Sequence, residues 1–238
     1  MTLPSNQPAV RPAATRRGIL FVISAPSGTG KTTLCKQIAS QVPGLWHSVS
    51  YTTRKPRPGE VNGREYFFVE EAVFLAMVER NEFVEWARVY GNLYGTPRKA
   101  LADKMEQGID VLLEIDVQGA RTVRKKFEDG VYIFILPPSF EALRTRLQSR
   151  AGDSPDEIQR RLQKAKEEVW SYREYYYIVR NDDLKQSLKE LESIFTVERI
   201  KTKRLNMTWL EDNFIKEARS LSPAPPPSPA TKENPPHD

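Results

Sequence analysis

Apolar residues in this chain gather in short unbroken runs, and the stretches between the runs carry helical spacing. Residues 19–24 and 131–136 are largely apolar and rich in β-branched residues, and 110–116 holds the apolar run Val-Leu-Leu and ends in acidic residues. Such runs are typical of strands buried on both faces. A shorter strand is predicted over 175–179, and helices are predicted over 31–40, 70–80, 97–107, from Ser139, from about Pro155, and over 184–205. Strands that alternate with helices predict an α/β fold with a parallel sheet in three layers.

The stretch between the first helix and residue 97 follows a different pattern. Loosely alternating segments at 47–53, 65–69 and 83–90 predict strands. The loop 54–60 holds two prolines and a glycine, which exclude regular structure there. In the helix over 70–80, four apolar residues share one face: Val73, Phe74, Met77 and Val78. Residues of about 48–96 are therefore expected to form a small β-rich insertion in the α/β frame.

Both ends of the chain lack these patterns. Residues 1–17 hold proline and small polar residues, and the proline-rich tail from about residue 222 cannot build a core, so we expect both to be disordered. The predicted organisation is an N-terminal extension 1–17, a domain over 18–205 and a C-terminal extension 206–238.

No apolar run has the length of a membrane span. The only cysteine, Cys35, is expected to be a packing residue, and the absence of any internal disulfide fits a cytoplasmic protein.

The formal net charge of +5 fits a nucleic-acid binder or an enzyme for phosphorylated substrates. The basic residues gather around 54–57 and 144–161, without the interleaved aromatic residues typical of nucleic-acid binding proteins. Their position favours phosphorylated small molecules as partners, and neither nucleic acid nor a membrane. A monomer and a homo-oligomer are both compatible with the sequence.

A glycine-rich turn follows the first strand and leads directly into the first helix. Such a phosphate loop presents backbone N–H groups and a helix N-terminus to an anion. Lys31 is expected to reach the β- and γ-phosphates of a nucleoside triphosphate, and the Thr32 hydroxyl is expected to bind Mg²⁺. The alternative is an ordinary glycine-rich turn with an exposed lysine, but the order strand, turn, helix favours the phosphate loop. The residues predicted to hold ATP are Ala25, Pro26, Ser27, Gly28, Thr29, Gly30, Lys31, Thr32 and Thr33.

A second polar cluster lies in the insertion. Arg54 and Arg57 share one short loop, between Ser50 and Tyr66. Arginine forks match phosphate oxygens, and tyrosine hydroxyls add donors, so the cluster can hold a phosphate dianion. A solvated charged turn is the alternative. The sequence disfavours the solvated turn, because Glu85 stands where simple core packing would place an apolar residue.

Four segments together resemble guanylate kinases. They are Ser-Ala-Pro-Ser-Gly-Thr-Gly-Lys at 24–31, Ser-Val-Ser-Tyr-Thr-Thr-Arg-Lys-Pro-Arg-Pro-Gly-Glu at 48–60, Gly-Asn-Leu-Tyr-Gly-Thr at 91–96, and Ile-Asp-Val-Gln-Gly at 115–119. The resemblance covers about residues 18–200, and the block Thr-Thr-Arg-x-Pro-Arg-x-Gly-Glu is highly specific. It implies a P-loop nucleoside monophosphate kinase with an inserted GMP-binding subdomain and a helical lid at about 144–161. The implied reaction, in purine metabolism, is transfer of phosphate from ATP to GMP, and to dGMP as well, with Mg²⁺.

The resemblance also assigns residues to roles. It implies that Arg146, Arg150 and Arg161 are lid and catalytic arginines beside Lys31 and Arg54, and that Asn181 lies near the adenine of ATP. It implies that GMP is held by Ser50, Arg54, Arg57, Tyr66, Glu85, Tyr94, Thr96 and Asp116. The chemistry of guanine supports Glu85, because one carboxylate can accept both N1–H and the exocyclic amino group, whereas adenine presents a lone pair at N1.

Three positions depart from the family pattern. Ala25 replaces the first glycine of the loop, a change that the family often shows. Glu114 stands where the family usually has aspartate, so Asp116 is the safer assignment for a direct contact. Ala151 follows Arg150 where glycine is usual.

Two other classes of protein share this pattern. Guanylate-kinase-like domains of scaffolds bind protein partners, but their phosphate loops are generally degraded, whereas here Gly28, Gly30, Lys31 and Thr32 are present. Another small-molecule kinase with the same core is the second alternative, and the set Glu85, Ser50 and Thr96 favours guanine over a sugar phosphate.

Overall fold

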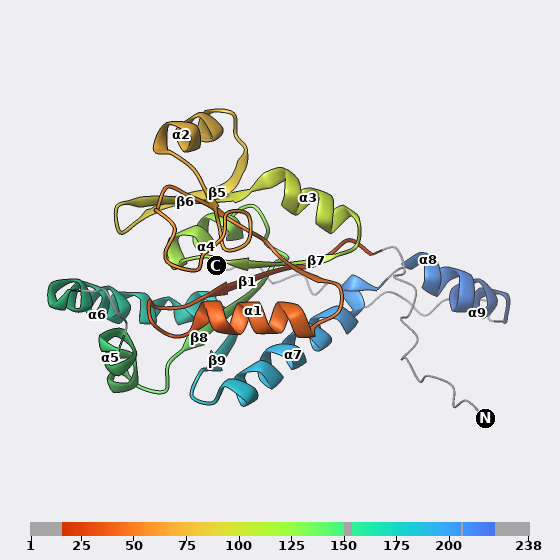
Figure 1. Ribbon diagram of the computed structural model, residues 1–238. Coiled ribbons are helices and arrows are strands. Elements are labelled where there is room, and N and C mark those ends of the chain that lie inside the picture. Colours follow the sequence, from red (N-terminus) through yellow and green to blue (C-terminus); the bar gives the residue numbers. More distant parts are fainter. Residues whose placement is uncertain (1–15, 150–153, 206, 222–238) are drawn as a thin grey trace, which may run out of the picture. The chain divides into compact units, whose positions relative to one another are not determined.

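The structure is a computed structural model that describes residues 16–149, 154–205 and 207–221 (Figure 1). Residues 17–200 form one compact unit, and the described residues from Lys201 onward belong to a second unit. Each unit is considered by itself. In the described parts of the chain, no helix combines the length and apolar character needed to cross a membrane.

A five-stranded parallel sheet forms the centre of residues 17–200. Its strands are β1 (Leu20–Ser24), β2 (Leu45–His47), β7 (Asp110–Glu114), β8 (Val131–Leu136) and β9 (Tyr177–Arg180). They pair in the order β2-β7-β1-β8-β9. The strands predicted at 19–24, 110–116, 131–136 and 175–179 are confirmed, and each of their predicted ends lies within two residues of the observed end. Because all five strands are parallel, their carboxyl ends and the loops that follow them meet at one edge of the sheet.

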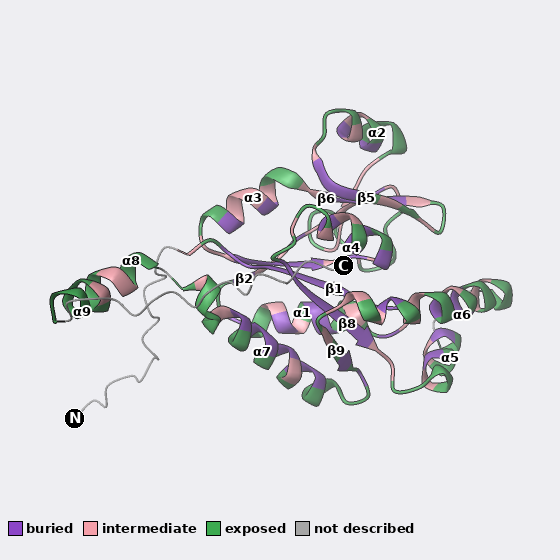
Figure 2. Cartoon of the chain, turned by 180° about the vertical axis from the view of Figure 1, so that it is seen from behind, coloured by how far each residue is buried: buried purple, intermediate pink, exposed green. Residues whose placement is uncertain are grey.

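Helices cover both faces of this sheet, as the burial pattern in Figure 2 shows. Phe21 and Ile23 of β1 pack with α1 (Lys31–Gln41) and α7 (Leu184–Ile200). The alternate residues Leu20 and Val22 pack on the other face, against α3 (Arg98–Glu106) and α4 (Val117–Arg124). A strand buried on both faces explains why β1 is a continuous apolar run. The predicted three-layer α/β fold is confirmed, and Cys35 is a buried packing residue of α1.

The insertion forms a second sheet of four strands. These are β3 (Tyr51–Thr52), β4 (Phe67–Phe68), β5 (Phe83–Val89) and β6 (Asn92–Pro97), in the order β4-β3-β6-β5, with α2 (Glu71–Glu79) beside them. Its own small core consists of Phe74, Met77, Phe83 and Leu93. The two strands of the β5–β6 hairpin pair from Phe83 with Pro97 to Val89 with Asn92, with one register shift between Phe83 and Glu85.

Two helices follow β8 and form a separate apolar cluster. They are α5 (Phe140–Gln148) and α6 (Pro155–Val169), joined by Leu143, Leu147, Leu162 and Ala165. Side chains cap both helices: the Ser139 hydroxyl accepts from the Ala142 amide at 3.0 Å, and the Ser154 hydroxyl accepts from the Glu157 amide at 3.3 Å. Both starts agree with the sequence, including Pro155 at the first turn of α6. A 3₁₀ turn, η1 (Trp170–Glu174), leads from α6 to β9.

Four local expectations were wrong or incomplete. The strand predicted over 47–53 is two strands, because β2 ends at His47 in the central sheet and β3 begins at Tyr51 in the other. Val73 does not join the buried face of α2, since it is 49% exposed. The helix α4 was missed, and the final predicted helix ends at Ile200 instead of Leu205.

The second unit contains helical turns that the sequence pattern did not indicate. They are η2 (Thr202–Arg204), α8 (Met207–Leu210), the π-helical η3 (Glu211–Ile215) and α9 (Lys216–Leu221). The predicted disorder of residues 1–15 and 222–238 lies outside the described residues. The domain limits 1–17, 18–205 and 206–238 stay predictions.

Candidate functional site

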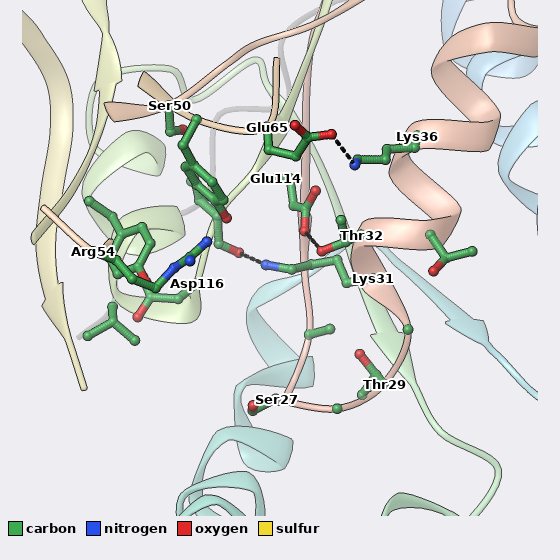
Figure 3. A pocket seen from close by; sticks show the side chains of 18 of the residues that line it. Ser27, Thr29, Lys31, Thr32, Lys36, Ser50, Arg54, Glu65, Glu114 and Asp116 are labelled. Atoms are coloured by element: carbon green, nitrogen blue, oxygen red, sulfur yellow. Dashed lines mark hydrogen bonds and ion pairs between the residues drawn. The ribbon is translucent and has the colours of Figure 1, made fainter. Parts of the chain in front are cut away.

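A large cleft opens at the carboxyl edge of the central sheet, and Figure 3 shows part of its lining. Its walls come from the loop after β1, the insertion, the end of β7, and helices α5 and α6. The cleft has a volume of about 1320 Å³. A pocket for one drug-sized ligand usually measures about 300–1,000 Å³, so this cleft has room for two nucleotides.

The loop after β1 has the backbone that a phosphate cradle requires. Gly28 and Gly30 have φ angles of 91° and 88°, which side-chain-bearing residues rarely adopt. A Cβ on Gly28 would lie 2.8 Å from Leu147 Cδ2, and one on Gly30 would lie 2.6 Å from Asn181 Nδ2. Both positions therefore need glycine for conformation and for space. Gly30 is also the N-cap of α1, so the loop ends at a helix N-terminus, where an anion is favoured.

Two side chains from distant segments fix the loop. Asn181, which follows β9, donates to the Thr29 carbonyl at 2.6 Å. Arg146 of α5 donates to the same carbonyl at 3.2 Å and to the Asn181 carbonyl at 2.9 Å. In this structure both residues hold the backbone of the phosphate loop, a role that the sequence did not indicate for either of them.

Lys31, Thr32 and Glu114 meet where β1 and β7 end (Figure 3). The Lys31 ammonium donates to the Ile115 carbonyl at 2.9 Å, and the Thr32 hydroxyl donates to Glu114 Oε1 at 2.5 Å. The hydroxyl and carboxylate oxygens are hard donors of the kind that Mg²⁺ takes, and Mg²⁺ sites commonly use one or two protein ligands with phosphate oxygens and water. The described residues contain no cluster of three or more acidic, histidine or cysteine side chains that could hold a metal alone. Thr32 and Glu114 thus fit a Mg²⁺ that is shared with a bound nucleotide.

Glu85 is a buried acid at the inner end of the insertion. It accepts a hydrogen bond from the Thr96 hydroxyl at 2.6 Å, and its residue is 5% exposed. Burial raises the pKa of the Glu85 carboxyl to about 7; the bond from Thr96 opposes the rise, and the charge of Asp116 adds to it. Asp116 accepts from the Gly119 amide at 2.9 Å and so caps α4. A Cβ on Gly119 would lie 2.7 Å from Glu85 Oε2, which explains a glycine in this helix.

The arginines of the insertion, Arg54 and Arg57, line the same cleft as Glu85. Arg54 pairs with Glu60 at 2.9 Å and donates to the Lys55 carbonyl at 2.7 Å. Its guanidinium also lies 5.4 Å from the ring centre of Tyr66. Arg57 is exposed, and its backbone amide donates to Glu60 Oε2 at 2.7 Å. Arg54 is thus held in place, whereas Arg57 lines the cleft as an exposed residue.

The structure brings almost every predicted residue to the one cleft. Thr96 and Asn181 do not line it, and each acts through a neighbour: Thr96 bonds to Glu85, and Asn181 bonds to Thr29. Arg150 lies outside the described residues. The predicted residues that line the cleft are Ala25, Pro26, Ser27, Gly28, Thr29, Gly30, Lys31, Thr32, Thr33, Ser50, Arg54, Arg57, Tyr66, Glu85, Tyr94, Asp116, Arg146 and Arg161.

Sequence reasoning missed three contributors. Glu114 was set aside in favour of Asp116, yet its carboxylate contacts Thr32 and lies 3.6 Å from His47 Nε2. Lys36 of α1 pairs with Glu65 of the insertion at 3.0 Å, which joins the two parts of the cleft (Figure 3). The sequence did hold a signal for Glu114. Side chains two residues apart in a strand point to the same face, so Glu114 and Asp116 were both candidates for one site. No local pattern pairs residue 36 with residue 65.

Comparison with known proteins agrees with the geometry of the cleft. The family model described as guanylate kinase matches residues 17–198. The guanylate kinase of Geobacter metallireducens is 51% identical over 196 residues, which are 82% of this chain and 97% of that protein. The guanylate kinase of Dechloromonas aromatica is 53% identical over 177 residues, 74% of this chain and 88% of that protein. The crystal structure of guanylate kinase from Anaplasma phagocytophilum superposes with a TM-score of 0.72 at 35% identity, and the match covers 84% of this chain and 97% of that one. The chain therefore belongs to the guanylate kinase family.

Proposed function

We propose that this protein transfers the γ-phosphoryl group of ATP to GMP, and to dGMP, giving ADP and GDP. One observation carries the proposal: an intact phosphate loop and a buried carboxylate for guanine, Glu85, line the same cleft. A phosphate loop alone indicates a nucleoside triphosphate, and Glu85 adds the base of the acceptor. A scaffold domain that only binds partners has no use for the loop, since Lys31 and the two glycines serve phosphate.

The donor nucleotide is proposed to lie along the loop. Backbone amides between Gly28 and Thr33 face the β-phosphate, and Lys31 reaches the β- and γ-phosphates. Thr32 and Glu114 would hold Mg²⁺, which when bound neutralises charge on the β- and γ-oxygens. Arg146 and Asn181 keep the loop in shape, as their bonds to the Thr29 carbonyl indicate.

The acceptor is proposed to lie in the insertion. Glu85 would accept hydrogen bonds from N1–H and the exocyclic amino group of guanine, with Thr96 fixing its carboxylate. Ser50, Arg54, Arg57, Tyr66 and Tyr94 would surround the phosphate of GMP. Adenine would place the lone pair of N1 against Glu85. The buried carboxylate would then lack a hydrogen-bond donor, so AMP should bind poorly.

The chemical step needs positioning and charge neutralisation above all. An oxygen of the GMP phosphate forms a bond to the γ-phosphorus of ATP, and the bond from that phosphorus to the β–γ bridging oxygen breaks. ADP leaves with that oxygen. The attacking oxygen is already anionic, so no general base is required. Lys31 and Arg161 supply positive charge around the group in transfer.

A coupled assay over a panel of nucleotides tests this proposal. GMP and dGMP should support ADP formation, whereas AMP, CMP and UMP should give rates lower by about 10³-fold or more. Equal rates with AMP and GMP would exclude a guanine-reading site. ADP formation without any acceptor would point to an ATPase.

Removal of either arginine of the insertion should weaken GMP selectively. Arg54→Ala and Arg57→Ala should each lower the affinity for GMP by about 10- to 100-fold, because a charge-assisted hydrogen bond contributes about 1.5–3 kcal/mol. The affinity for ATP should change less than twofold, since the insertion touches only the acceptor. Calorimetric titration with each nucleotide measures both values, and an equal loss for ATP would show that the two sites are misassigned.

The binding of GMP should depend on pH through Glu85. With a pKa of about 7 in the empty site, Glu85 is mostly protonated at pH 6 and mostly ionised at pH 8. GMP needs the carboxylate, so its affinity should fall about tenfold from pH 8 to pH 6. The phosphate of GMP titrates near this range too, and the Glu85→Gln variant serves as the control that retains only that contribution. An identical pH profile in both proteins would contradict the assignment.

The proposed location is the cytoplasm. The reaction consumes ATP, and the buried thiol of Cys35 needs no oxidising compartment.

A further inference from the structure

The tip of the β5–β6 hairpin carries a large aromatic residue where its backbone disfavours one. Tyr90 and Gly91 have φ angles of 47° and 81°, two successive left-handed positions. Two-residue hairpin turns of this kind favour Asn-Gly, and bulky residues are rare at φ above zero. Among the described residues, the only other non-glycine with a positive φ is Asn81. The contacts of the Tyr90 side chain should therefore explain why a tyrosine stands at this turn.

The Tyr90 ring is the meeting point of three parts of the cleft. The guanidinium carbon of Arg161 lies 5.3 Å from the ring centre, and the Lys164 ammonium lies 4.8 Å from it. Both cations come from α6, one helical turn apart. Tyr90 and Ser27 of the phosphate loop both line the cleft. Figures 1 and 2 place the hairpin and α6 at the same end of the unit, as these contacts require.

The burial of Arg161 favours its contact with the ring, although Tyr90 itself is 45% exposed. The face of an aromatic ring attracts cations, and the attraction is greater where the cation has lost water. Arg161 is only 6% exposed, and Glu157 pairs with it at 3.0 Å. Lys164 pairs with Glu168 at 3.3 Å. The two cations repel each other, and the ring between the insertion and α6 offers both a common partner.

We propose that Tyr90 is a positioning residue for phosphoryl transfer, whose ring holds Arg161 and Lys164 beside the phosphate loop. The proposal rests on the proposed function, in which Arg161 neutralises charge on the group in transfer. Tyr90 belongs to the acceptor insertion and Arg161 to α6, so the ring couples the placement of the acceptor to that of the arginine. The side chain does not need to touch the reacting atoms to do so.

Two substitutions separate the ring from the turn and from the hydroxyl. Tyr90→Asn removes the ring but retains a residue that the left-handed turn favours, so the hairpin should fold. Its kcat should fall about tenfold, which corresponds to 1.4 kcal/mol, while the affinities for GMP and ATP change less than threefold. Tyr90→Phe keeps the ring and should retain kcat within threefold. Tyr176→Ala is the matched control, because that exposed tyrosine lies 5.0 Å from the Arg124 guanidinium carbon outside the cleft.

An unchanged kcat in Tyr90→Asn would overturn the proposal. So would an equal loss in Tyr90→Phe, since that result would assign the effect to the hydroxyl instead of the ring. A fall in affinity as large as the fall in kcat would indicate a general loss of structure instead of misplaced cations.

Hydrogen exchange supplies a readout that does not depend on kinase activity. Peptides from α6, residues 155–169, should exchange faster in Tyr90→Asn than in the parent protein, and at the parent rate in Tyr90→Phe and Tyr176→Ala. Unchanged exchange in Tyr90→Asn would overturn the proposed contact even in an active kinase. Absence of GMP phosphorylation in the parent protein would instead overturn the proposed function.

Discussion

Replacement of Lys31 by alanine is expected to lower kcat by about 10²–10³-fold or more, while the fold stays intact. The ammonium group is the one side-chain charge of the loop, and in the proposed function it neutralises charge on the phosphoryl group in transfer. The lost bond to the Ile115 carbonyl is a single hydrogen bond, worth about 1 kcal/mol of folding free energy. Initial rates with saturating GMP and ATP measure the effect, and thermal unfolding reports the stability.

Lys99→Ala is the control for this experiment. Lys99 is an exposed lysine of α3 that pairs only with Asp103 in the neighbouring turn, so its removal should leave kcat unchanged. A near-normal kcat in Lys31→Ala would contradict the assignment of the loop to phosphate. A cooperative unfolding transition far below that of the parent would show that Lys31 has a structural role.

Replacement of Glu85 by glutamine should raise the KM for GMP by about 10- to 100-fold and should relax the rejection of AMP. The amide offers guanine one acceptor in place of two, and its amino group can donate to N1 of adenine. The affinity for ATP should not change, because Glu85 lies in the acceptor part of the cleft. Steady-state kinetics with GMP and AMP at pH 8 measure both effects, and equal GMP kinetics in variant and parent would show that Glu85 only packs.

The stability of this variant is a separate check. Burial raises the pKa of Glu85 above its value in the unfolded chain, so ionised Glu85 lowers the free energy of unfolding as pH rises from about 4.5 through about 7. Glutamine removes that cost and still accepts from Thr96. The variant should therefore unfold at an equal or higher temperature than the parent at pH 8. Glu79→Gln, at an exposed glutamate near the end of α2, should change neither kinetics nor stability.

The elements and motifs of this protein follow from short-range sequence signals. The unbroken apolar run of β1 reflects burial on both faces, and the glycines of the loop reflect φ angles that other residues avoid. Ser139 and Ser154 mark helix starts through bonds that span three residues. The helix α4 was missed because its cap, Asp116, had been assigned to the end of the preceding strand, and the buried spacing of Val117, Ala120 and Val123 was not used.

The tertiary structure decided how these pieces form a site, because the decisive contacts join residues far apart in sequence. Thr32 meets Glu114 across 82 positions, Arg146 meets Thr29 across 117, and Asn181 meets Thr29 across 152. No local pattern of hydrophobic and polar residues encodes such pairs, since their distances depend on the order of strands in the sheet. The same holds for Tyr90, which the sequence presents as the last residue of a predicted strand. Only the packing of the hairpin against α6 places its ring between two cations.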